Sequence, residues 1–172
     1  TTEFALKILK KFALKNSLEL EIIPRTNWKQ EEEFYSQMID GYTLNKKIGF
    51  AHSYNLVSDE AIIIGCTSTF TMECFAAGYR TGFLTFRQHV IPTDHPEAFR
   101  YVEWAWPGKT EEQGFFWSNI KDELSITTVL NNLMQVDQKK WESIYKPYRD
   151  KLMTFDSNNK IIKSHIESEK IN

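Results

Sequence analysis

Three consecutive hydroxyl residues, Thr67, Ser68 and Thr69, follow an apolar run and precede a carboxylate, Glu73. Backbone N–H groups at the start of a helix point outward with the positive end of the helix dipole, and hydroxyl groups add further donors. Thr69 and Glu73 are four residues apart and therefore share one helix face. This pattern suits a bound phosphate at the hydroxyl turn, with Glu73 accepting charge-assisted hydrogen bonds from the vicinal hydroxyls of a ribose.

Ordinary helix capping accounts for the same residues. Ser68 or Thr69 as an N-cap would stabilise the helix by about 1 kcal/mol, and Glu73 would then be a solvated helix residue. Both interpretations stay open on spacing alone.

The sequence on either side of this turn predicts a strand before it and a helix after it. The run 61–65 is continuous and β-branched, which is typical of a strand covered by helices on both faces. A helix over 70–77 would end at Gly78, and 81–86 reads as the next strand. The remaining apolar periodicity predicts helices over 4–13 and 28–39 and after Asp122 and Asp137, and strands over 18–23 and 48–51.

Alternating helices and strands favour right-handed crossovers and a parallel sheet. We therefore predict one Rossmann-like α/β domain over 1–172, with three layers, helices on both faces and a mostly parallel sheet of about four or five strands. Pro147 should kink or break the helix after Asp137. The segment 88–118 reads as a long loop, and 156–172 as a weak helix with a tail.

The carboxyl ends of the predicted strands carry further polar residues. Arg25 follows the first strand, Tyr54 follows the second and Arg87 follows the last. Ligands of parallel sheets bind beyond these ends. Cations and hydroxyls would therefore gather at one edge of the sheet, in a composition suited to a phosphorylated ligand.

Composition excludes several other classes. The net charge of -2 and the pI near 6.1 argue against a nucleic-acid partner. No apolar run reaches the length of a transmembrane segment, and neither the histidines nor the cysteines have metal-ligand spacing, so we expect no metal and no cofactor. Cys66 is expected to be a buried packing residue. We expect a cytoplasmic protein, with a peripheral location at the inner membrane as an alternative.

The segment 59–78 combines the apolar strand, the Ser68-Thr69 pair, Glu73 and Gly78. It resembles the carboxyl-terminal Rossmann domain of two-domain, GT-B type glycosyltransferases, and more narrowly bacterial surface-carbohydrate (lipopolysaccharide and capsule) biosynthesis proteins. The likeness continues more loosely through 114–117 and 137–141. It implies a nucleotide-sugar donor as substrate, with Ser68 and Thr69 at its phosphates and Glu73 at its ribose.

The resemblance also implies an incomplete enzyme. The amino-terminal half of such transferases binds the glycan or lipid-linked acceptor, and 172 residues leave no room for it. The isolated domain should bind without turnover, and no catalytic residue is identified. Two other functions remain open: a nucleotide-sugar 2-epimerase-like half domain, and a non-catalytic doubly wound interaction or sensory domain.

Overall fold

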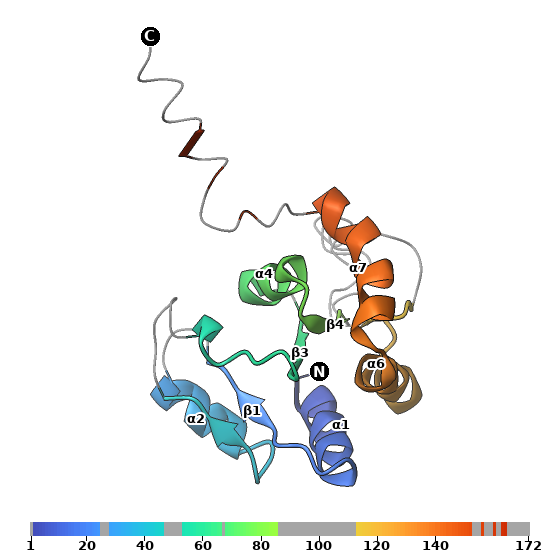
Figure 1. Cartoon of the computed structure of the whole chain (residues 1–172). Helices are drawn as coiled ribbons and strands as arrows, with labels where there is room; N and C mark the ends of the chain where they lie inside the picture. Colours follow the sequence, from blue (N-terminus) through green and yellow to red (C-terminus); the bar gives the residue numbers. More distant parts are fainter. Residues whose placement is uncertain are drawn as a thin grey trace, which may run out of the picture.

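The computed structural model (Figure 1) describes residues 2–24, 28–46, 53–66, 68–85, 113–152, 156, 160 and 163–164. Helices and strands alternate through most of this part of the chain. In order they are α1 (Thr2–Lys15), β1 (Glu21–Ile22), α2 (Trp28–Ser36), β2 (Thr43–Leu44), β3 (Ile62–Gly65), α4 (Thr69–Ala77), β4 (Arg80–Leu84), β5 (Trp117–Ser118), α6 (Glu123–Gln135) and α7 (Gln138–Leu152).

The strands are parallel and form two sheets. β1 pairs with β2, with Ile22 opposite Leu44. The other sheet has the order β3-β4-β5, with Ile64 opposite Gly82. The predicted α/β class with parallel pairing is therefore confirmed. Within the described residues, however, the strands are divided between two sheets, whereas the sequence pattern predicts a single one.

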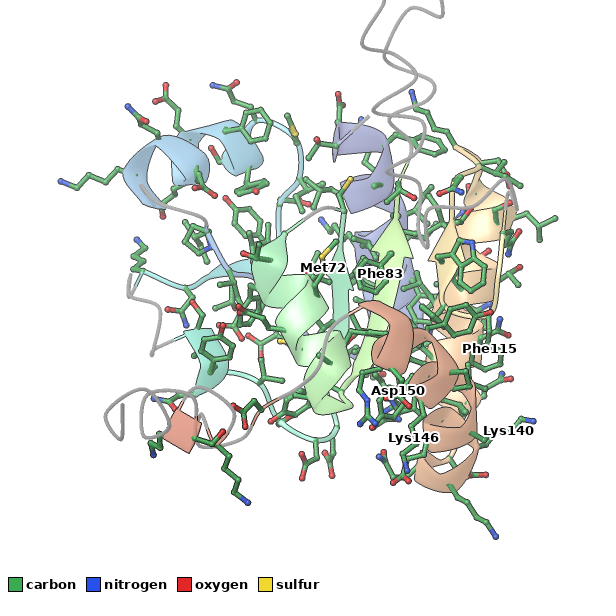
Figure 2. All side chains as sticks on the ribbon, turned by 90° about the horizontal axis from the view of Figure 1, so that it is seen from above. Met72, Phe83, Phe115, Lys140, Lys146 and Asp150 are labelled. Carbon is green, nitrogen blue, oxygen red and sulfur yellow. The ribbon has the colours of Figure 1, made fainter. Side chains whose placement is uncertain are left out.

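Helices cover both faces of the larger sheet (Figure 1). On one face, α1 and α6 pack together, and their apolar side chains meet Leu84 of β4. On the other face, α4 contacts β3, β4 and α7. Figure 2 shows α4 lying over the strands, where Met72 of α4 packs against the cluster that contains Phe83 of β4.

The best-packed part of the molecule is an aromatic cluster between α4, the larger sheet, α6 and α7. The Phe75 ring contacts those of Phe83, Phe116, Trp141 and Tyr145 at centroid distances of 5.6, 4.9, 6.0 and 5.8 Å. The Trp141 indole N–H donates to the carbonyl of Gly78 at 2.8 Å. This bond fixes α7 to the end of α4.

Gly78 ends α4 in the left-handed conformation, with φ of 98°. The N–H of Gly78 donates to the carbonyl of Phe75 and the N–H of Tyr79 donates to that of Cys74, which closes the last turn. A Cβ at position 78 would lie 2.8 Å from the Tyr145 hydroxyl. Glycine is thus required there by both backbone angle and space.

The predicted caps of the last two helices are confirmed. The carboxylate of Asp122 accepts from the N–H of Ser125 at 2.8 Å, and that of Asp137 accepts from Lys140 at 2.8 Å. α7 continues through Pro147 to Leu152, so the alternative of a break at the proline is wrong. The predicted strand 48–51 and most of the predicted loop 88–118 lie outside the described residues.

Candidate functional site

The turn between β3 and α4 depends on a close approach of strand and helix. A side chain at Gly65 would overlap Thr71, which is buried on the first turns of α4. The absence of a Cβ therefore lets the start of α4 lie against the end of β3. This contact sets the direction in which the helix N-terminus points.

Ser68 occupies the N-cap position of α4, as one of the two sequence interpretations expects. Its backbone is extended, with φ of -74° and ψ of 133°, but its side chain makes no capping hydrogen bond. Its carbonyl accepts from the N–H of Met72 at 3.2 Å. Ser68 and Thr69 are both exposed, so their hydroxyls are presented to solvent at the helix start.

Glu73 lies one turn further along α4 and is paired with another predicted site residue. The Tyr54 hydroxyl donates a hydrogen bond to the Glu73 carboxylate. The Tyr54 ring packs on Phe70 of α4 with 5.3 Å between centroids, and 42% of Tyr54 remains exposed. The structure thus brings together two residues that are 19 positions apart in the sequence.

A cavity of about 640 Å³ opens beside the turn. Ser68, Phe70 and Thr71 of the turn and first helical residues line one end of it. Glu73 and Tyr54 are not among its lining residues, but Phe70 joins the two places, because its ring also contacts Tyr54. A ligand that reaches both Ser68 and Glu73 would therefore lie at the mouth of the cavity rather than inside it.

The described walls of this cavity are mainly aliphatic and carry negative charge. Their acidic residues are Glu19, Glu21 and Glu60, and no Lys, Arg or His occurs among the described lining residues. A phosphate at the turn would be held by N–H and hydroxyl donors. The remaining predicted site residues, Arg25, Thr67 and Arg87, lie outside the residues that the structure describes.

The two cysteines differ in environment. Cys74 of α4 is 1% exposed, and burial, with a smaller contribution from the Glu73 charge, raises the pKa of its thiol to about 11. This thiol stays protonated at neutral pH and is a poor nucleophile. Cys66 is exposed, so the expectation that it is buried is wrong. It directly follows β3 and is one of the residues that line the cavity.

A polar cluster at the carboxyl ends of β4 and β5 was not predicted from the sequence. The Thr85 hydroxyl donates to the side-chain oxygen of Asn119, and both residues are buried. Ser118, also buried, accepts from the N–H of Ile120 at 3.1 Å. The Ser118-Asn119 pair directly after an aromatic run is the sequence signal that could have located this strand end.

No group of three or more His, Cys, Asp and Glu side chains that could hold a metal gathers within the described part of the chain. None of the helices found there has both the length and the apolar character needed to cross a bilayer.

Comparison with known proteins identifies the family. A family model described as "putative O-antigen biosynthesis protein" matches residues 1–170. No curated protein and no solved structure matches the chain. Since the match spans nearly every residue, including the β3–α4 turn and both caps of the last two helices, the chain belongs to this family of O-antigen biosynthesis proteins.

Proposed function

We propose that this chain is the nucleotide-sugar donor-binding domain of a glycosyltransferase in surface polysaccharide synthesis. The family match supports the pathway. The observation that carries the finer proposal is the Tyr54–Glu73 hydrogen bond beside the exposed start of α4. It places an oriented carboxylate one helical turn from a set of N–H and hydroxyl donors.

The donor's phosphates would bind at Ser68 and Thr69. The helix N-terminus offers N–H groups there, and the Ser68 hydroxyl is not used as a cap. Negative charge at this end is stabilised by the helix dipole. In the complete enzyme the same donors, with Arg25 or Arg87, would stabilise the departing nucleotide.

The ribose would bind at Glu73. An ionised carboxylate has about four acceptor positions, so the bond from Tyr54 leaves room for both ribose hydroxyls. The Tyr54 bond also restrains the carboxylate in one orientation, which lowers the entropic cost of binding. Tyr54 is thus a positioning residue as well as an exposed aromatic surface for the ligand.

The sugar acceptor, a glycan or a lipid-linked molecule, would be held by another domain. The chain alone should therefore bind the nucleotide without transferring the sugar.

Calorimetric titration with UDP, GDP, CDP and dTDP tests this proposal. We expect one of them to bind and Glu73→Ala to weaken it about 10- to 100-fold, as expected for loss of hydrogen bonds to a charged group. Tyr54→Phe keeps the ring and should weaken binding less, by about 3-fold. Glu33→Ala, at an exposed position of α2, is the matched control and should leave affinity unchanged.

Absence of binding by all four nucleotides, with an intact fold by circular dichroism, would refute the proposal and favour a non-catalytic interaction domain. Binding that Glu73→Ala leaves unaltered would refute the assigned site.

A further inference from the structure

The large cavity is lined by two strands, each of which has an edge without a strand partner within the described part of the chain. β3 is the edge strand of the larger sheet, and β1 has β2 on only one side. Both Glu19–Ile23 and Ala61–Cys66 line the cavity. No pairing joins β1 to β3 among the described residues, so their free edges face a common space.

The hydrogen bonds show which backbone groups of β1 face this space. The carbonyls of Leu20 and Ile22 accept from Thr43 and Asn45 at 2.9 and 3.1 Å, so these two residues face β2. Successive strand residues direct their backbone groups to opposite edges. The N–H and C=O groups of Glu21 therefore point to the other edge.

The same reasoning applies to β3. Phe83 and Thr85 donate to the carbonyls of Phe116 and Ser118, on the β5 side, so Gly82, which directly precedes Phe83, faces β3. Gly82 is opposite Ile64, and in a parallel ladder it bonds the residues on either side of that partner. Ile62 and Ile64 thus direct their backbone groups to the open edge. Two facing rows of donors and acceptors result.

These rows restrict what can fill the cavity. An alkyl chain would suit the aliphatic walls but would bury unpaired backbone groups, which is costly. A nucleotide could bond to the edges but would place polar atoms against the walls. An extended peptide satisfies both requirements, because its backbone pairs with the edges and its side chains contact the walls.

The charge around the cavity specifies the peptide further. Among the described lining residues, Glu19, Glu21 and Glu60 are acidic and none is basic. Among the residues that the structure describes, Glu19 and Glu21 accept hydrogen bonds from the neutral side chains of Thr43 and Asn45 at 2.6 and 3.0 Å, and these partners do not compensate their charges. A segment with basic ends is favoured over an acidic one.

We propose that this cavity binds an extended aliphatic segment of a partner protein, flanked by Lys or Arg, as an added strand between β1 and β3. The added strand joins the two sheets into one. The added strand lies along β3, before the turn at Ser68. This inference does not depend on the proposed nucleotide site.

The test uses the whole chain and a capped peptide of sequence Lys-Val-Ile-Val-Ile-Val-Lys. We expect the amides of Glu21, Ile62 and Ile64 to exchange with solvent at least tenfold more slowly when peptide is present, as measured by NMR. A matched peptide with N-methyl groups on alternate residues keeps the side chains but loses backbone donors. Its affinity should be at least tenfold lower.

Charge reversal gives a second readout. Glu60→Lys should weaken the peptide about fivefold, whereas Glu33→Lys, on the exposed side of α2, should not. Equal affinity of the methylated peptide would overturn the proposal. So would slow exchange of the three amides in the free protein, which would mean that β1 and β3 pair directly or, if it depends on protein concentration, that a second copy fills the space.

Discussion

Two regions of this protein are packed very differently. Around Trp141 and Phe75, aromatic rings fill the space between α4, β4 and α7, and Trp141, Phe83 and Phe116 are fully buried. Around β1 and β3, aliphatic side chains surround a cavity of about 640 Å³, and all four residues of β3 are only partly buried. We therefore expect the first region to contribute more to the stability, whereas in the second the facing edges of β1 and β3 have no strand partner among the described residues.

The difference follows from side-chain shape. Large rings contact one another across several elements and bury a large area each. The Ile62–Ile64 run has no aromatic counterpart on β1, whose strand residues are Glu21 and Ile22. Substitutions in each region test whether the two differ in this way in solution.

The largest effect is expected from Trp141→Ala in the aromatic cluster. Removing this fully buried ring should lower the free energy of unfolding by about 3–5 kcal/mol, measured by urea denaturation. Trp141→Phe keeps the ring contacts but loses the bond to Gly78 and should cost about 1–2 kcal/mol. A loss below about 1 kcal/mol for the alanine variant would show that this cluster is not the main core.

A matched pair of leucines compares the two regions directly. Leu133→Ala, in the aromatic cluster, should cost about 3 kcal/mol, because the space it leaves cannot collapse. Leu9→Ala should cost about 1 kcal/mol, since Leu9 is partly buried and already lines the cavity. Equal losses in denaturation experiments would mean that both regions are equally well packed in solution.

Cys74 predicts a pH dependence of stability. Its pKa rises from the ordinary 9.0 to about 11 in the folded protein, so the unfolded chain loses the thiol proton first. Stability from this group is therefore complete below pH 9 and is lost as the pH rises toward 11, by about 3 kcal/mol in total. Cys74→Ala should show a shallower fall over this range than the parent chain, and an identical slope would rule out this origin.

The smallest effect concerns the Asp122 cap of α6. Hydrogen bonds from the Ser125 hydroxyl and N–H hold the pKa of Asp122 below its usual value. Asp122→Ala should cost about 1 kcal/mol at neutral pH. The difference between the two proteins should disappear as the pH falls through that lowered pKa, which thermal melts at a series of pH values can measure.

The helices could be predicted well from the sequence because their signals are local. Gly78 as a stop for α4, and Asp122 and Asp137 as caps, each act within one turn of the chain. The short strands were harder to predict from the sequence. β2 at Thr43–Leu44 and β5 at Trp117–Ser118 have only two residues each and depend on pairing with distant partners.

In the candidate site, too, some features could be predicted from the local sequence and others could not. The positions of Ser68 and Thr69 at the start of α4 follow from the sequence around them. The Tyr54–Glu73 hydrogen bond and the Thr85–Asn119 pair do not, since each joins residues from different elements. The open space between β1 and β3 could not be predicted at all, because the apolar pattern of a strand is the same whether or not its neighbour in the sheet pairs with it.

Because α4 is held at both ends, we expect it to keep its position when a ligand binds. Thr71 rests against Gly65 at one end, and the Trp141 indole holds Gly78 at the other. A helix whose two ends are both fixed does not tilt toward a ligand. Adjustment would therefore fall to the exposed Tyr54 ring, so we expect one preformed wall and one adaptable wall at the same opening.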